Sequence, residues 1–206
     1  SAASITSLLK LYPKVLVIDF DAHHGNGTQE IFWNESRVLH IDIHERGIYP
    51  GTGDFSDLGG NKALGTKINI PIPPFSEDSL YLWVINNVID RLMELFKPDV
   101  IVVSAGFDAY DEDPLTDLKA SELTYEAFGY ILNEYLETGL VKGVISILEG
   151  GYTEGLARGI PSYIKGLSGR FRDRKRIREL VGNAERSYSE VVKRVMEIVS
   201  RYWKGF

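Results

Sequence analysis

Cysteine is absent from this 206-residue sequence. The absence excludes disulfide bonds, thiolate metal sites and cysteine nucleophiles, so any bound metal must be held by His, Asp or Glu. Long apolar stretches are missing too: no run approaches the roughly 20 residues that a membrane-spanning helix needs, and no leader resembles a signal peptide. We therefore expect a cytoplasmic protein that does not act at a membrane.

Basic residues are outnumbered, with 23 Lys and Arg against 29 Asp and Glu and a formal net charge of −6. This balance argues against direct nucleic-acid binding. The 44% of hydrophobic and 25% of charged residues are ordinary proportions for a folded domain. The length suits one domain with a substantial core, and we expect it to cover residues 1–206.

Five short segments have the near-continuous apolar pattern of strands that helices cover on both faces: residues 14–19, 37–42, 67–72, 99–104 and 143–148. Helical periodicity marks residues 78–96, 124–137 and 184–203, and we expect the last to pack on the domain as a closing helix. The alternation predicts a single α/β domain, a mainly parallel sheet with helices on both faces. Ligands of such folds gather at the carboxyl ends of the strands.

Potential metal ligands stand at two of these strand ends. Asp19, Asp21 and His23 alternate after the first strand, and alternate side chains of an extended backbone point to one side. Asp108 follows the fourth strand and belongs at the same end of the sheet. Two carboxylates and one imidazole would give zinc three ligands and leave a position for water or substrate. Each motif alone could instead be a polar turn.

A glycine pair follows the fifth strand. Gly150 and Gly151 would let the backbone pass close to a ligand and bring Tyr152 to the same end of the sheet. A phenol there could donate a hydrogen bond to the oxyanion that forms in amide cleavage. The alternative is a glycine turn followed by an aromatic packing residue.

Six motifs appear in order: Asp-x-Asp-x-His-His-Gly-x-Gly-Thr-Gln at 19–29, Tyr-Pro-Gly-Thr-Gly at 49–53, Asn-Ile-Pro at 69–71, Ser-Ala-Gly-Phe-Asp-Ala at 104–109, Asp-Pro-Leu at 113–115 and Leu-Glu-Gly-Gly-Tyr at 148–152. Together they resemble the histone deacetylase and acetylpolyamine amidohydrolase superfamily, which has the arginase-deacetylase fold. The resemblance covers about residues 1–156. It implies zinc-dependent hydrolysis of an acyl amide, with an acylated amine such as acetyl-lysine or an acetylpolyamine as substrate.

The resemblance also implies a role for each site residue. The zinc ligands would be Asp21, His23 and Asp108, and Tyr152 would stabilise the transition state. Asp19 and Asn26 match positions that orient a pair of catalytic histidines, with His24 in a structural role beside them. Tyr49, Gly150 and Gly151 would line the acyl-lysine channel. A structural K⁺ or Na⁺ ion would be held by groups at Asp19, Asp21, His23, Asp42 and Ile43.

One departure concerns the general base, which is a tandem His pair in the family. The four histidines here are His23, His24, His40 and His44, and none occupies the position of that pair. Residues 1–11 resemble a helix that follows the missing region. We therefore expect the carboxy-terminal part of a deacetylase-like domain, incomplete at its N-terminus and inactive alone, whose base comes from an upstream segment or a partner chain.

Two other functions fit parts of the sequence. An arginase-type ureohydrolase also uses an Asp-Ala-His stretch, here residues 21–23, but its two manganese ions need further carboxylates. His24 and Asn26 stand where the first motif would supply one. A non-catalytic subunit that binds a metal or acyl-lysine is the second alternative, because the general base is missing.

Overall fold

The computed structural model describes the backbone of residues 1–169 and 174–206, and the side chains of residues 1–169 and 179–206. Within these residues one all-parallel sheet has the strand order β3-β2-β1-β4-β5. Its strands are β1 (Val15–Asp19), β2 (Val38–Glu45), β3 (Lys67–Ile72), β4 (Val100–Ala105) and β5 (Val144–Leu148). Each lies where the sequence predicts a strand, and the single α/β domain is confirmed.

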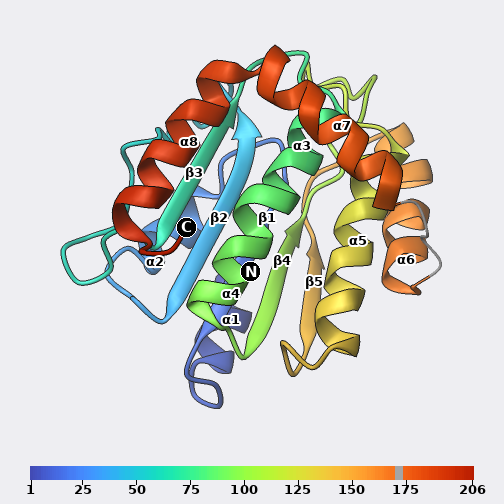
Figure 1. Ribbon diagram of the computed structural model, residues 1–206. Coiled ribbons are helices and arrows are strands. Elements are labelled where there is room, and N and C mark those ends of the chain that lie inside the picture. Colours follow the sequence, from blue (N-terminus) through green and yellow to red (C-terminus); the bar gives the residue numbers. More distant parts are fainter. Residues whose placement is uncertain (170–173) are drawn as a thin grey trace.

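Helices cover both faces of the sheet (Figure 1). The face toward the viewer carries α3 (Asp78–Val84), a π-helical turn (Ile85–Ile89), α4 (Asp90–Phe96), α5 (Glu122–Glu137), a second π-helical turn (Gly155–Gly159), α6 (Ile160–Leu167), α7 (Arg174–Ser187) and α8 (Ser189–Tyr202). Behind the sheet lie the short helices α1 (Ala2–Leu8) and α2 (Asn26–Ile31).

The closing helix expected over residues 184–203 is two helices. They are separated at Tyr188, whose backbone leaves the helical region at φ −123° and ψ 34°. The Tyr188 hydroxyl accepts a hydrogen bond from the main-chain nitrogen of Glu77, which precedes α3, at 3.0 Å. This tertiary contact interrupts an apolar periodicity that runs on through the break. The second helix, α8, packs on β3 as expected, through buried residues such as Val191 and Val195.

The side chains of β1 show why the inner strands are apolar at every position. Leu16 and Ile18 join the large core under α3 to α8, whereas Val15 and Val17 join a small core with α1 and α2. Because each face of the sheet has its own core, alternate residues are buried on opposite sides.

Strand β5 does not follow this pattern, and the prediction that helices cover both of its faces is wrong. Ile145 is 42% exposed and Leu148 is 57% exposed. The strand lies at one edge of the sheet, where no other described strand pairs with it. The opposite edge strand, β3, is fully buried because α8 packs on it.

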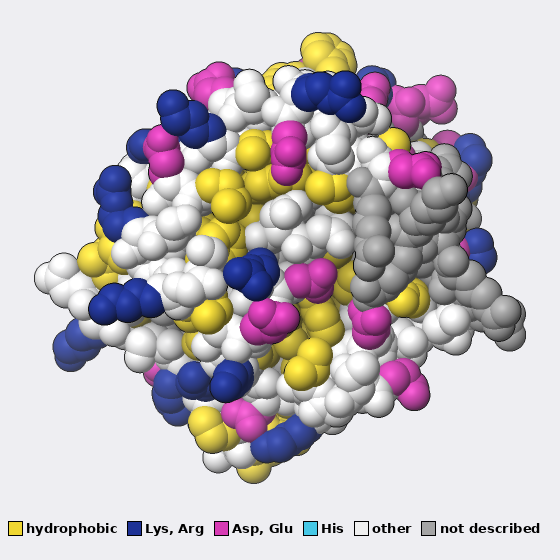
Figure 2. Space-filling view, viewed as in Figure 1, with side chains coloured by type: hydrophobic (Ala, Val, Ile, Leu, Met, Phe, Trp, Pro, Cys, Tyr) yellow, Lys and Arg dark blue, Asp and Glu magenta, His cyan; other side chains and the backbone are white. Residues whose placement is uncertain are grey.

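The surface over α3, α5 and α8 mixes charged side chains of both signs with small apolar areas, and no histidine is visible there (Figure 2). His24, His40 and His44 are buried inside the molecule, and only His23 is partly exposed. None of the helices in the described part of the chain is long and apolar enough to cross a membrane.

Candidate metal centre

Loops that follow β1 and β4 carry the expected metal ligands. The two strands are neighbours, and their register pairs Asp19 with Ser104. Asp21 and His23 lie just beyond the end of β1, and Asp108 lies three residues beyond β4. The parallel pairing therefore brings these loops together at the carboxyl ends of the strands, where open α/β sheets bind ligands.

The three side chains meet as a compact group. The His23 Nδ1 atom lies 2.8 Å from Asp108 Oδ2 and 3.1 Å from Asp21 Oδ1. One potential ligand atom from each residue lies within 4.8 Å of the other two. Asp108 is completely buried, Asp21 is nearly so, and His23 is partly exposed. One side of the group is thus enclosed by protein and the other can be reached from solvent.

Main-chain nitrogens hold both carboxylates in place. Ala22 N donates to Asp108 Oδ1 at 2.8 Å, and Gly150 N donates to Asp21 Oδ2 at 2.8 Å. The second bond ties the loop after β5 to the group. A side chain at Gly150 would overlap Asp108 Oδ2, and one at Gly106 would lie 2.5 Å from the Cα of Asp21. Both positions therefore require glycine for close backbone approach.

The charges of the group are strongly coupled. Hydrogen bonds to Asp108 and Asp21 raise the pKa of His23 to about 10. Burial opposes ionisation of Asp21, yet hydrogen bonds from His23 and from Gly150 N hold its pKa below the usual value. Burial raises the pKa of Asp108. Without a metal, the imidazole is therefore held as a cation between two carboxylates.

This donor set fits zinc. One imidazole nitrogen and two carboxylate oxygens are ligands that zinc accepts, and three protein ligands leave a coordination position open. On metal binding the His23 ring would lose its proton, and the ion would take the place of that proton between the imidazole nitrogen and the carboxylates. No further carboxylate joins the group among the described residues, so a pair of bridged manganese ions finds no additional acid here.

A cavity of about 420 Å³ opens beside the group, lined by Ser1, Ala2, Asp19, Asp21, His23, His24, Gly25, Gly27, Thr28, Ile31, Ser104 and Glu149. A larger cavity of about 630 Å³ lies between the loop after β2 and α8, but it includes none of the three ligands. We assign the chemistry to the smaller cavity because the convergent donor atoms are there.

Both tyrosines expected at the site lie at the surface, whereas the expected channel residues Gly150 and Gly151 are buried. Tyr152 is 58% exposed and Tyr49 is 81% exposed. The main chain of Tyr152 is anchored through a 3.3 Å hydrogen bond from its nitrogen to Asp113 Oδ2. Gly150, two residues earlier, donates its main-chain N–H to Asp21, so the loop that leads to Tyr152 starts at the metal group.

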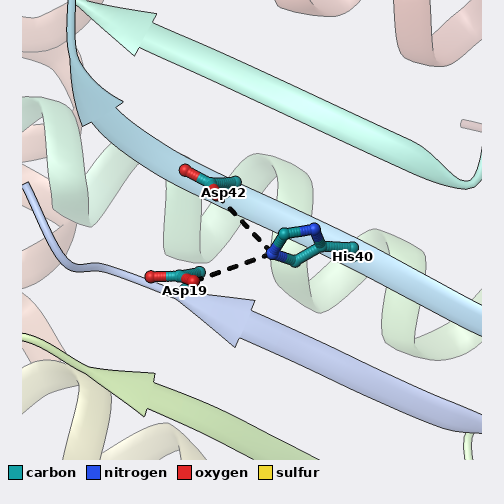
Figure 3. A group of neighbouring side chains, drawn as sticks. All are labelled: Asp19, His40 and Asp42. Atoms are coloured by element: carbon teal, nitrogen blue, oxygen red, sulfur yellow. Dashed lines mark ion pairs between the residues drawn. The ribbon is translucent and has the colours of Figure 1, made fainter. Parts of the chain in front are cut away.

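A second group of polar side chains lies beside the first. Asp19 Oδ1 accepts a hydrogen bond from Asp21 N at 3.2 Å, while its Oδ2 atom lies 3.8 Å from His40 Nε2. His40 Nε2 is also 3.5 Å from Asp42 Oδ2 (Figure 3). Burial and the charges of Asp42 and Asp21 raise the pKa of Asp19.

The remaining expected neighbours surround this second group. His24 Nδ1 lies 2.8 Å from Thr52 Oγ1, and its ring packs against that of His44 at a centroid distance of 4.9 Å. Asn26 is the first residue of α2. Sequence reasoning gave no role to His40. The alternation of His40, Asp42 and His44 along β2 repeats that of Asp19, Asp21 and His23, and it is the signal that could have identified His40.

A parallel α/β fold with a convergent Asp, His and Asp group at its strand ends is typical of metal-binding α/β proteins. Comparison with known proteins identifies the family. The model of the histone deacetylase domain matches residues 1–167, so the chain belongs to this family. An uncharacterized protein of Methanocaldococcus jannaschii is 48% identical over 165 residues, 80% of this chain and 46% of its own. A probable deacetylase of Archaeoglobus fulgidus is 39% identical over 142 residues, 69% of this chain and 40% of its own.

Solved structures agree with the family. The HDA15 HD domain matches with a TM-score of 0.79 and 29% identity, over 98% of this chain and 55% of that one. An acetylpolyamine aminohydrolase from Burkholderia pseudomallei matches with a TM-score of 0.73 and 30% identity, over 81% of this chain and 48% of that one. The chain spans about half the length of these relatives. The expected superfamily is confirmed, and its members are deacetylases that depend on a metal.

Proposed function

We propose that this chain carries the metal-binding part of a site for zinc-dependent hydrolysis of an acyl amide, acting on acetyl-lysine or acetylpolyamine-like substrates. The observation that carries the proposal is the convergence of Asp21, His23 and Asp108 within 4.8 Å at the ends of two neighbouring strands. Zinc bound there would polarise the acyl carbonyl and lower the pKa of a water molecule.

The chain's own residues would position and stabilise the reacting groups. Main-chain nitrogens of Ala22 and Gly150 fix the two carboxylates, so the ligand atoms need little reorganisation. Tyr152, anchored through its main chain to Asp113, would donate its hydroxyl proton in a hydrogen bond to the developing oxyanion. Exposed Tyr49 would contact the acyl chain as substrate enters.

The general base would come from outside this chain. None of the four histidines is positioned as a general base. His23 lies between two carboxylates, His40 is buried, and the rings of His24 and His44 pack on each other. None is left to take a proton from water in the cavity. An upstream segment or partner chain is our candidate source. The monovalent ion and a cytoplasmic location stay predictions.

An amidase assay tests the proposal. Acetate release from an acetyl-lysine peptide and from an acetylpolyamine would be measured for the zinc-loaded chain, alone and mixed with the part of the M. jannaschii relative that the chain does not match. Alone, the chain should be about 10²–10⁴-fold slower than the mixture, because the general base is missing. Asp108→Asn should abolish turnover in the mixture.

Other outcomes favour the alternatives. Acetyl-lysine binding without turnover in the mixture would favour a binding subunit. Two bound manganese ions and hydrolysis of a guanidinium substrate would favour a ureohydrolase. Either result would overturn the deacylase proposal.

A further inference from the structure

We infer that Phe75 selects acylated polypeptides over acylated polyamines, because its exposed ring binds an apolar side chain next to the acyl-lysine of the substrate. The inference rests on the proposed function and names the substrate class of the same site. Phe75 lies outside all six motifs that carry the family resemblance, and it is not a ligand of the metal.

Phe75 has a backbone conformation that large side chains avoid. Its φ angle is 63°, in the left-handed region, where the side chain crowds the backbone of every residue except glycine. Among the described residues, the other non-glycine residues with positive φ are Lys97, at the end of α4, and Glu112, and both are polar. A bulky aromatic residue in this region is exceptional, and strained residues of this kind cluster at functional sites.

The structure fixes the backbone of Phe75 without burying its side chain. Phe75 N donates a hydrogen bond to Asp117 O at 2.9 Å, and the next residue, Ser76, accepts one from Lys119 N at 2.9 Å. Ser76 is fully buried, and its hydroxyl donates to Pro73 O at 2.7 Å. Phe75 itself is 63% exposed and belongs to neither apolar core. Glycine would suit this position better, so the fold does not explain the aromatic ring.

The segment bonded to Phe75 leads to the metal group. Asp117 follows Thr116, whose hydroxyl donates to the main-chain oxygen of Asp108 at 2.7 Å. Asp117 N donates to Glu45 Oε2 at 2.9 Å, and this bond holds the segment against the end of β2. Phe75 follows β3 by three residues, so it lies at the same end of the sheet as Asp108. One short segment therefore connects Phe75 to a predicted zinc ligand.

The same segment continues toward the predicted oxyanion donor. Leu115, two residues before Asp117, is 53% exposed. Leu115 N donates to Asp113 Oδ1 at 3.0 Å, and the other oxygen of Asp113 accepts the hydrogen bond from Tyr152 N. Exposed apolar side chains thus follow the segment from the backbone partner of Phe75 to that of Tyr152.

The substrate chemistry follows from this arrangement. An acyl-lysine that reaches the metal brings its neighbouring residues along, and these stay at the surface because only the long side chain reaches inward. An apolar neighbour would lose water contact against Phe75. A polyamine has charged amines and no apolar side chain, so it would gain nothing from the exposed ring.

Peptide binding tests the inference. Fluorescence anisotropy would measure the affinity of the zinc-loaded chain for labelled acetyl-lysine peptides that differ only in the residue next to acetyl-lysine, Leu or Ser. The Leu peptide should bind about 3–10-fold more tightly, because a side chain of this kind is partly buried on binding. Acetylspermidine, measured by competition, should bind no more tightly than the Ser peptide.

Phe75→Asn is the informative variant, because Asn enters the left-handed region readily but has no apolar ring. It should bind both peptides equally, with a Tm equal to or above that of the unchanged chain. Phe75→Tyr should keep the preference for Leu. Leu140→Asn is the matched control, since Leu140 is 55% exposed but precedes β5 at the opposite end of the sheet. This control should keep the preference too.

The outcomes separate this inference from the proposed function. If acetyl-lysine peptides bind but the unchanged chain does not prefer Leu, or Phe75→Asn retains the preference, the inference is overturned and the proposed function stands. Lower self-association of Phe75→Asn in sedimentation velocity, with peptide binding unchanged, would assign Phe75 to a contact between copies and also overturn it. If no acetyl-lysine peptide binds the zinc-loaded chain, both proposals fail.

Discussion

His23 is held between Asp21 and Asp108, and this arrangement makes metal binding compete with a proton. The imidazole binds metal only when its Nδ1 atom is deprotonated. In the metal-free protein the pKa of His23 is about 10, compared with an ordinary value of 6.5. A proton therefore occupies the ring throughout the neutral range and has to leave when zinc binds.

The first prediction concerns this proton. Zinc affinity should rise about tenfold per pH unit from pH 7 until it levels off near pH 10, because a single proton competes with zinc and each pH unit lowers the proton concentration tenfold. Isothermal titration calorimetry with zinc, in buffers that differ in ionisation enthalpy, should report about one proton released per zinc bound at His23. An affinity that does not change over this range would contradict the charge state that we assign to His23.

The second prediction concerns Gly150. A methyl group there would overlap Asp108 Oδ2 and lie 2.7 Å from Asp21 Oδ2. Gly150→Ala should therefore displace both carboxylates and weaken zinc binding at this group by more than about tenfold. Gly143→Ala is the control, because a methyl group at that position meets nothing within 4 Å. Equal zinc affinities for the two variants would show that the backbone can shift to accept the methyl group.

Single residues of the candidate site differed in how well the sequence predicted them. Asp21, His23 and Asp108 could be predicted because they follow two buried strands, and strand ends meet at one end of a parallel sheet. His40 could not be assigned, since it lies inside a buried strand where its partner depends on register. Asp19 and Asp42 are 23 positions apart in sequence, and only the pairing of β1 with β2 places them together.

At the level of elements, the apolar pattern predicted the positions of all five strands along the chain. It did not predict which strands lie next to each other in the sheet or which strand lies at an exposed edge. The sequence of β5 is as apolar as that of β1, yet β5 is partly exposed at the sheet edge. Strand order depends on contacts between distant parts of the chain, which a local apolar pattern does not record. The same limit explains the break at Tyr188, where a contact with Glu77 ends one helix and the next begins.

The third prediction follows from the exposed edge. An apolar edge strand is a template for pairing with other chains. Ile145→Lys should lower self-association of the isolated chain with little effect on thermal stability, because Ile145 is already 42% exposed. Sedimentation velocity measures the effect. Ile31→Lys, which changes an exposed residue of α2, should leave self-association unchanged. If both variants associate like the original chain, the β5 edge is not the contact surface.

At the scale of the whole molecule, the group of Asp21, His23 and Asp108 connects loops that follow strands far apart in sequence. Zinc that binds only the folded chain stabilises it by about 2.7 kcal/mol at a concentration 100 times the dissociation constant of a site. The fourth prediction is that Asp108→Asn reduces the zinc-dependent rise in Tm. Asparagine can still accept the hydrogen bond from Ala22 N, so the metal-free fold should survive.

Glu149→Gln provides the control for this fourth prediction. Glu149 lines the same cavity but does not belong to the group of Asp21, His23 and Asp108. Its variant should show the full zinc-dependent rise in Tm, measured by differential scanning calorimetry. A rise that is the same in Asp108→Asn and Glu149→Gln would mean that Asp108 does not bind the ion.

Anomalous X-ray diffraction from a zinc-soaked crystal tests the central claim most directly. The account predicts an anomalous peak within bonding distance of Asp21, His23 Nδ1 and Asp108, with one coordination position free of protein atoms. A structure in which these side chains are ordered but no zinc peak lies between them would contradict it.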